Sequence, residues 1–220
     1  MTSLTSEELG YYRLNRRAWA LLAPVYDSAT APFSRLRYIV AELVPLAAGA
    51  RVLDVATGTG AQAFAFAEKA REVVGVDISP AMLKIARRKN HRTNVSFQES
   101  DATCLPFSDG SFDVTSVSFA LHEMPVSIGE RTVREMVRVT RPGGSVVIVD
   151  YALPQSPIGR FVAYHAIRLY EGRTYAAFVR ADRAALLGRA GIAGVEHHAA
   201  LWGVAAVTLG RKPLGSQEGS

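Results

Sequence analysis

Short apolar runs alternate with helical patterns or loops through the middle of this chain, and this alternation limits the fold more than any other sequence feature. The apolar runs lie at 51–55, 72–77, 95–100, 112–119 and 145–150. Strands that are separated in this way by helices form βαβ units with a parallel sheet. We therefore expect an α/β fold with helices on both faces of the sheet.

Capping residues predict where several of the intervening helices begin and end. Ser79 can cap a helix that has Pro80 at its first position. Ser127 and Glu130 match the capping-box pattern, which predicts a helix that starts there. A later helix should end before Gly191, because glycine readily adopts the left-handed conformation that closes helices.

The length of 220 residues suits one α/β domain, and 49% hydrophobic with 20% charged residues is typical of a globular protein. We expect a helical lid at 1–45 and the sheet domain at 46–212, closed by a hairpin at 195–209. A segment at about 151–180, rich in aromatic residues and arginine, should cover the substrate. A flexible tail is expected at 213–220.

Charge and cysteine content narrow the classes of partner. The net charge of +5 is spread along the chain, which favours a solvated surface over a nucleic-acid interface. Cys104 is the single cysteine, so neither an intrachain disulfide nor a cysteine zinc site can form. No apolar run reaches the roughly 18–20 residues of a membrane span, and the first residues lack a signal peptide's apolar region. We expect a cytoplasmic protein without a metal or nucleic-acid partner.

A glycine loop, Ala56-Thr57-Gly58-Thr59-Gly60, follows the first expected strand. Glycines at the carboxyl end of a strand let a ligand approach the backbone closely. Gly58-x-Gly60-x-x-Ala63 also fits the dinucleotide pattern, so a nicotinamide-dependent oxidoreductase is a rival interpretation, and a simple tight turn is another. Asp54 stands in an otherwise apolar strand, where a carboxylate needs a cation or hydrogen-bond donor.

Two further acids end neighbouring strands. Asp77 closes the second expected strand, where a carboxylate can accept both hydroxyls of a ribose. Asp101 follows the third, where a carboxylate can reach an adenine amino group. Because ligands of open α/β sheets bind outside the carboxyl ends of the strands, these acids and the glycine loop predict one nucleoside site.

Four segments together resemble the class I methyltransferases that use S-adenosylmethionine (SAM), most of all the ubiquinone/menaquinone biosynthesis C-methyltransferase group. They are VLDVATGTG (52–60), VVGVDIS (73–79), SDATCLPFSDGSFDVTSVSFALHEMP (100–125) and VTRPGGSVVIVDY (139–151). The run from Trp19 to Asp27 is similar to that group's N-terminal lid. The resemblance implies a Rossmann-like, mostly parallel seven-stranded sheet with a C-terminal antiparallel hairpin, and SAM as the cofactor.

The resemblance also implies roles for individual residues. The glycine loop would wrap the methionine part of SAM, Asp77 would hold the ribose, and Asp101 would meet the adenine. Ser118 and Phe119 would line the methionine side. The residues expected to bind SAM are Tyr26, Asp54, Thr57, Gly58, Thr59, Gly60, Asp77, Ile78, Met82, Asp101, Ala102, Ser118 and Phe119.

His122 is the candidate catalytic residue, because it lies just past the fourth expected strand and near the expected methyl group. Aligning donor and acceptor can lower the barrier by ~7–11 kcal/mol. A general base helps only when the acceptor must lose a proton. A histidine that bonds to backbone and shapes the loop is the alternative, and Glu123 either orients His122 or caps a helix.

The acceptor is the most open question. The resemblance favours a small apolar or amphipathic acceptor, such as a quinol-like ring methylated at carbon or oxygen, with peripheral membrane contact. A lipid-amine or small-metabolite N-methyltransferase and a SAM-binding protein without activity remain alternatives. Tyr164, His165, Tyr170 and Tyr175 are candidates for an acceptor pocket. No tyrosine has a lysine four positions on, which argues against a short-chain reductase.

Overall fold

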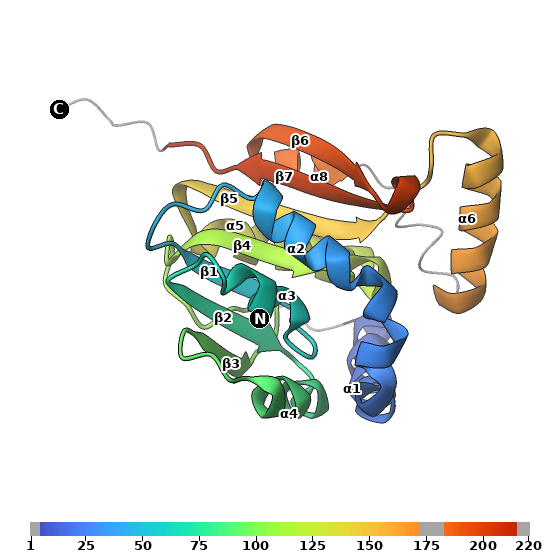
Figure 1. Ribbon diagram of the computed structural model, residues 1–220, viewed down its shortest axis with the longest axis horizontal. Helices are drawn as coiled ribbons and strands as arrows, with labels where there is room; N and C mark the ends of the chain where they lie inside the picture. The colour runs from blue at the N-terminus through green and yellow to red at the C-terminus, as the bar shows by residue number, and fades with distance from the viewer. Residues whose placement is uncertain (1–4, 172–182, 215–220) are drawn as a thin grey trace.

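A seven-stranded sheet forms the centre of the computed structural model, which describes residues 5–171 and 183–214 (Figure 1). The strands lie in the order β3-β2-β1-β4-β5-β7-β6. Their bounds are Arg51–Val55 (β1), Glu72–Asp77 (β2), Val95–Glu99 (β3), Phe112–Ser118 (β4), Thr140–Tyr151 (β5), Ala193–Ala200 (β6) and Ala205–Arg211 (β7). The first five strands pair in parallel, and β7 runs antiparallel to both β5 and β6. The expected α/β fold with a C-terminal antiparallel hairpin is confirmed.

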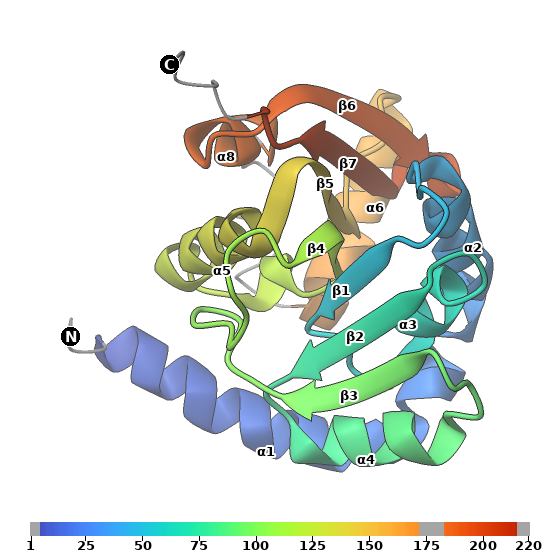
Figure 2. The same ribbon diagram turned by 90° about the vertical axis from the view of Figure 1, so that its left-hand side faces the viewer.

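Helices cover both faces of this sheet (Figure 2). The helices among the described residues are α1 (Ser6–Ala29), α2 (Ser34–Leu43), α3 (Ala61–Phe66), α4 (Pro80–Lys89), α5 (Val126–Val139), α6 (Pro157–Glu171) and α8 (Arg183–Arg189), with short 3-10 turns η1 (Ala31–Phe33), η2 (Leu121–Glu123) and η3 (Leu201–Gly203). Successive strand residues point to opposite faces. Val52 therefore packs with α2 and α3, whereas Leu53 packs with α5 and α8.

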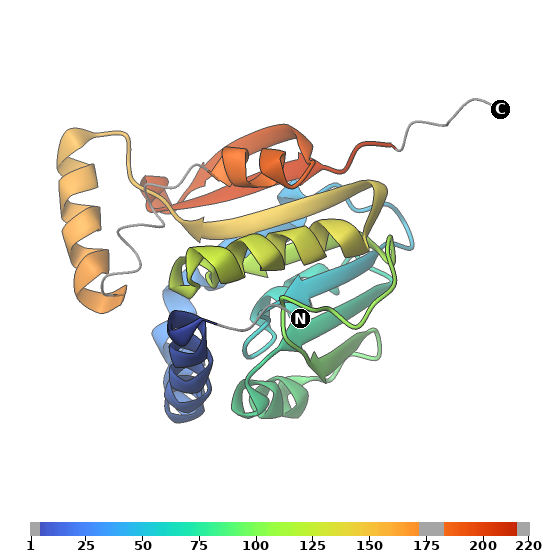
Figure 3. The same ribbon diagram turned by 180° about the vertical axis from the view of Figure 1, so that it is seen from behind.

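Two helices stand apart from these layers. Helices α1 and α6 lie beyond the carboxyl ends of the parallel strands, as Figures 1 and 3 show from opposite sides. Among the described helices, none is both long and apolar enough to cross a membrane. The sheet thus presents its carboxyl edge to α1, which is where the sequence predicts the nucleoside site.

Most predicted helix boundaries agree with the structure. Ser79 caps α4 by accepting a hydrogen bond from Met82, and Gly191 follows α8 with φ +86°. The capping box at Ser127 and Glu130 was a wrong prediction. Pro125 is the residue before α5, and the Ser127 hydroxyl donates to Glu8 of α1 at 2.7 Å.

Other differences are small or lie outside the described residues. The helix after the glycine loop ends at Phe66, where a turn follows, rather than near Ala70. Strand β5 begins at Thr140, earlier than the expected Ser145. A capping box that the sequence analysis missed starts α1, where Thr5 and Glu8 bond reciprocally. Tyr175 falls in 172–182, and part of the expected tail in 215–220, both outside the described residues.

Candidate functional site

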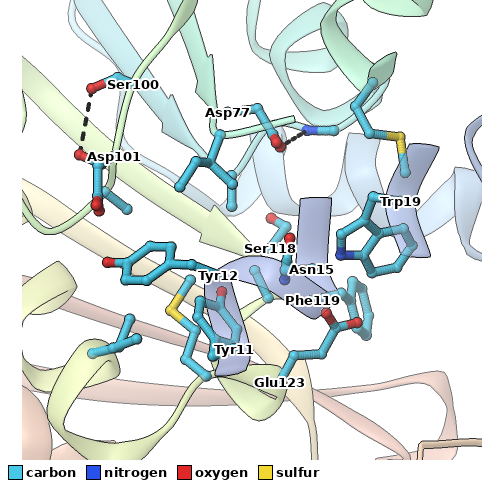
Figure 4. Close-up of a pocket in the computed structure, with 18 of the residues that line it drawn as sticks. Tyr11, Tyr12, Asn15, Trp19, Asp77, Ser100, Asp101, Ser118, Phe119 and Glu123 are labelled. Atoms are coloured by element: carbon cyan, nitrogen blue, oxygen red, sulfur yellow. Dashed lines mark hydrogen bonds between the residues drawn. The ribbon is translucent and has the colours of Figure 1, made fainter. Parts of the chain in front are cut away.

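A cleft of about 710 Å³, including its open mouth, lies between the carboxyl edge of the sheet and α1 (Figure 4). Most of the residues predicted to bind SAM line it. They are Tyr26, Gly58, Asp77, Ile78, Met82, Asp101, Ala102, Ser118 and Phe119. Residues as far apart in the sequence as Gly58 and Phe119 therefore meet in one place, as the common edge of parallel strands predicts.

The glycine loop is held by β2 through its backbone. The amide of Thr57 donates to the carbonyl of Val76 at 2.9 Å, and the amide of Gly58 donates to Asp77 Oδ2 at 2.8 Å. Gly60 has φ +82°, and a Cβ there would lie 2.6 Å from the Phe97 ring. Glycine is required at that point because it alone fits both the left-handed backbone and the neighbouring ring.

Asp77 lines the cleft, and both of its carboxylate oxygens accept hydrogen bonds from backbone amides. Its Oδ1 accepts from the amide of Ser79 at 2.8 Å while its Oδ2 accepts from Gly58. Burial raises the pKa of Asp77, and these backbone hydrogen bonds oppose the shift. A carboxylate oxygen has two lone pairs, so both oxygens can still accept from a ligand hydroxyl.

Four of the predicted residues do not line the cleft: Asp54, and three members of the glycine loop, Thr57, Thr59 and Gly60. The hydroxyl of Thr57 donates to Asp54 Oδ2 at 2.6 Å, and Asp54 is 1% exposed. Burial raises the pKa of Asp54 to about 7. Thr59 donates to Asp27 on α1, and Gly60 is the residue directly before α3. These residues stabilise the conformation of the loop. Their spacing in the sequence does not distinguish that role from direct contact with the ligand.

Helix α1 forms the wall opposite the sheet. Tyr11, Asn15 and Trp19 line the cleft from one face of the helix, together with Tyr12 (Figure 4). Tyr26 lines it as well. Burial raises the pKa of Tyr26 to about 12. Tyr11, Tyr12 and Asn15 were not predicted from the sequence. The spacing of four between 11, 15 and 19 was the available signal, because such residues share one face of a helix.

The start of α1 is attached to the opposite side of the cleft. Glu8 is buried and accepts from Ser127 Oγ and from Arg131 Nη2, each at 2.7 Å. The amide of Thr5 also donates to Glu8, and these hydrogen bonds lower the pKa of Glu8 to about 2. Helix α1 is thus bonded to α5 near its first turn and to the glycine loop near its last.

A second, larger cavity adjoins the cleft. It has about 2340 Å³ of space including its mouth, and it shares Tyr11, Asn15, Trp19, Tyr26, Phe119 and Glu123 with the cleft. His122 lines this cavity and not the cleft itself. Tyr164 and His165, predicted for an acceptor pocket, lie on α6 and are not among the side chains that line either cavity.

His122 is 2% exposed, and its Nδ1 lies 2.7 Å from Oδ1 of Asp150, a residue near the end of β5. Glu123 was considered as the group that orients His122. Its carboxylate lies farther away, 3.8 Å from Nε2. Asp150 is not among the site residues predicted from the sequence. An acid inside an apolar strand was the signal that could have found it, as it did for Asp54.

Two non-glycine residues next to the cleft have left-handed backbones. Ala56 follows β1 with φ +53°, and Phe119 follows β4 with φ +50°. Such a conformation is uncommon for alanine and a genuine outlier for a bulky residue. Because strained residues cluster where ligands bind, these two turns independently point to the carboxyl ends of β1 and β4.

Comparison with known proteins agrees with this geometry. A family model described as a methyltransferase domain matches residues 52–144. A demethylmenaquinone methyltransferase of Clavibacter sepedonicus is 35% identical over 187 residues, which cover 76% of each chain. The chain belongs to the class I SAM-dependent methyltransferases of the ubiquinone/menaquinone C-methyltransferase group. The resemblance that the motifs indicated is confirmed.

Further matches define how far the likeness extends. A demethylmenaquinone methyltransferase of Renibacterium salmoninarum is 39% identical over 138 residues, or 60% of this chain and 56% of the relative. The chain thus spans only a little over half the length of that relative. The solved phosphoethanolamine N-methyltransferase 2 of Haemonchus contortus, in complex with S-adenosylhomocysteine, has a TM-score of 0.62 at 18% identity over 81% of this chain and 52% of that one. That likeness supports the fold alone.

Proposed function

We propose that this protein transfers a methyl group from SAM to a carbon of a quinol-like ring. The observation that carries the proposal is the pair of adjoining cavities, one lined by the cofactor motifs and the other by aromatic side chains. A methyltransferase must place donor and acceptor in line, and two cavities that share a wall provide that arrangement.

The polar side chains of the cleft match the polar groups of SAM. Asp77 would accept the ribose hydroxyls, and Asp101 would accept from the adenine amino group, with Ile78 and Met82 packed on the adenine. The hydroxyl of Ser118 is buried and has no hydrogen-bond partner among the described residues. Because such a group is costly to bury, a polar group of the cofactor at that point would account for it. When bound, SAM supplies an electrophilic methyl group on a sulfonium.

The larger cavity suits an aromatic acceptor. Tyr11, Trp19, Phe33, Phe119 and Tyr151 line it. Aromatic side chains pack favourably against a flat ring in offset or edge-on arrangements. The relatives named as demethylmenaquinone methyltransferases favour the same class of acceptor, although the chain spans only part of their length.

Ring methylation at carbon needs a base, because the hydroxyl of the quinol must give up its proton to activate the ring. His122 lines the aromatic cavity and is the residue that we propose for this step. General base catalysis typically contributes about 10²–10⁴-fold to the rate. Alignment by the two cavities would supply the larger part of the acceleration.

Peripheral membrane contact is part of the proposal. Leu21 and Leu22 of α1 are exposed, as are Ile158, Phe161 and Val162 of α6. Both helices stand at the carboxyl edge of the sheet, where the larger cavity lies. An acceptor with a long apolar tail resides in the bilayer, and exposed apolar side chains with a positive net charge favour an anionic membrane surface.

Labelled SAM offered with several acceptors tests the function. We expect S-adenosylhomocysteine release and labelled organic-phase product with a reduced demethylmenaquinone of short tail. Lipid amines and water-soluble catechols serve as competing acceptors, and Asp77→Ala as the inactive control. Label found only in aqueous products, or only in lipid amines, would overturn the proposed acceptor. SAM that does not bind would overturn the cofactor placement as well.

A further inference from the structure

We propose that Asp150 is the positioning residue of this methyltransferase, which holds His122 with its proton on Nδ1 and thereby makes Nε2 the basic nitrogen. This inference rests on the proposed function, because it concerns the base that the ring acceptor requires. Nothing in the motifs assigns Asp150 a role, and Glu123 was the neighbour first considered for orienting His122.

The contacts of Asp150 determine how the imidazole is held. Oδ1 of Asp150 lies 2.7 Å from Nδ1 of His122 and also accepts from the amide of Tyr151 at 2.8 Å. Oδ2 accepts from the amide of His122 at 3.3 Å. Two backbone amides donate to this carboxylate, which is therefore an acceptor site, and we assign the ring proton to Nδ1 as the third donor. The same carboxylate thus binds both the ring and the backbone of His122.

The location of Asp150 is unfavourable for a purely structural residue. It is fully buried, and Val147, Ile148 and Val149 before it are buried apolar residues. A buried carboxylate is costly unless several donors satisfy it. An apolar residue would fill the same position of β5 without that cost. Asp150 instead bonds to His122, which lines the larger cavity.

The backbone of the preceding turn fixes where His122 lies. The amide of Phe119 still donates to Val149 at 2.7 Å, which continues the pairing of β4 with β5. Phe119 then takes φ +50°, and η2 begins two residues later. The His122 ring lies 4.8 Å from that of Tyr151, so the imidazole is confined between Asp150 and an aromatic side chain.

The chemistry of this pair follows the atoms. Nε2 takes the proton of the quinol hydroxyl, and the electron pair of that O–H bond stays on the oxygen, from which charge is delocalised into the ring. Ring electrons form the new bond to the methyl carbon, while the carbon–sulfur pair leaves with sulfur. The ring carbon then loses its own proton and the oxygen regains one, so one proton is released for each methyl transferred. Asp150 stabilises the imidazolium that forms, because a charged hydrogen bond is about twice as strong as a neutral one.

Asp150→Asn tests the proposal with little change in volume. We expect kcat to fall by about 10²-fold or more, because an amide can donate to Nδ1 and so favour the wrong tautomer. The affinity for SAM, measured by calorimetry, should stay within about twofold, because Asp150 lines neither cavity. Wild-type imidazole ¹⁵N shifts should show His122 protonated on Nδ1, and the variant should lose that signature.

A double variant separates positioning from a structural role. If Asp150 acts through His122, then Asp150→Asn added to His122→Gln causes no further loss of kcat. Thr208→Val is the matched control, because Thr208 is buried on β7 and bonds to Nδ1 of His197 at 3.0 Å. It should change the His197 signals and leave kcat unaltered.

Three outcomes would overturn the proposal. They are a wild-type His122 protonated on Nε2, an unchanged kcat in Asp150→Asn, and additive losses in the double variant. If Asp150→Asn does not fold, the tautomer of His122 in the wild type and the kcat of Asp150→Glu still test the proposal. Glutamate keeps a carboxylate that can accept from Nδ1. A wild-type enzyme that methylates no quinol would refute the proposed function instead, and the ¹⁵N shifts would still report how Asp150 holds the ring.

Discussion

The hydroxyl of Thr59 donates a 2.6 Å hydrogen bond to Oδ1 of Asp27, which joins the glycine loop directly to helix α1. Lys89 of α4 bonds to Oδ2 of the same carboxylate at 2.6 Å. Burial alone would raise the pKa of Asp27, but the hydrogen bonds from Lys89 and Thr59 lower it. The helix that forms one wall of the cleft is therefore coupled to the loop that forms the other.

Asp27→Ala should loosen this coupling. We expect faster hydrogen exchange in the C-terminal half of α1 and a loss of roughly 1 kcal/mol in SAM affinity, because a hydrogen bond to a charged group is removed. Saturating SAM should slow the exchange of wild-type residues 5–27, since closure of the lid protects their amides. Exchange mass spectrometry and calorimetry measure both effects.

Glu42→Ala is the control for that experiment. Glu42 of α2 pairs on the surface with Lys69, which lies in the turn after α3, and neither residue lines a cavity. It should leave the exchange of α1 and the SAM affinity unaltered. If SAM does not change the exchange of wild-type α1, the lid hypothesis is wrong, and α1 is a static wall.

Asp77→Ala should weaken SAM binding by ~2–4 kcal/mol, because hydrogen bonds to a charged carboxylate are lost. Asp77 lines the cleft, and its two oxygens accept hydrogen bonds from the amides of Gly58 and Ser79. Calorimetric titration measures the loss. Glu68→Ala, which removes only a surface pair with Arg92, is the matched control. Wild-type affinity in a folded Asp77→Ala would mean that the ribose binds elsewhere.

Asp54→Asn should change how stability depends on pH. The pKa of Asp54 is about 7 in the folded protein, against about 3.9 in an unfolded chain. Between these values the folded state binds more protons, so the free energy of unfolding of the wild type falls as pH rises from about 4 to 7. The asparagine variant lacks this group and can still accept from Thr57.

Urea denaturation at pH 5 and pH 8 measures that difference. The wild type should lose more stability than Asp54→Asn over this interval, by on the order of a few kcal/mol. Asp109→Asn, at an exposed side chain, should follow the wild type. Parallel profiles for the wild type and Asp54→Asn would show that Asp54 titrates normally.

The sheet could be predicted from the sequence because each strand is a short apolar run that ends in a turn. The acids of the cleft could also be predicted, since Asp77 ends one such run and Asp101 follows another. The pairing of His122 with Asp150 could not be predicted. The two residues are 28 positions apart, and they meet only because β4 and β5 pair in the register of Ser118 with Val149. That register depends on the whole fold.

The wall formed by α1 was predicted only in part. Trp19, Tyr26 and Asp27 were found through the lid pattern, whereas Tyr11 and Asn15 matched no motif. Their spacing of four places them on one face of a helix, but α1 buries few apolar side chains, so no apolar stripe shows which face meets the sheet. Ser127 was misassigned for a related reason. Its hydroxyl bonds to Glu8, 119 residues away, and local rules for helix starts cannot anticipate such a contact.

Lys212→Met separates the stability of the fold from the function of the cleft. Nζ of Lys212 donates to the carbonyls of Val137 at 2.8 Å, Arg138 at 3.3 Å and Thr140 at 2.7 Å. These carbonyls lie at the end of α5, where a helix leaves acceptors unpaired and favours a positive charge. Methionine keeps the length of the side chain but removes every donor. We expect a loss of roughly 1–2 kcal/mol in the free energy of unfolding, with unchanged SAM affinity because Lys212 lines neither cavity. Urea denaturation and calorimetry measure the two quantities, and Lys69→Met, at a surface pair, should alter neither. A Lys212→Met protein with wild-type stability would show that water satisfies those carbonyls equally well.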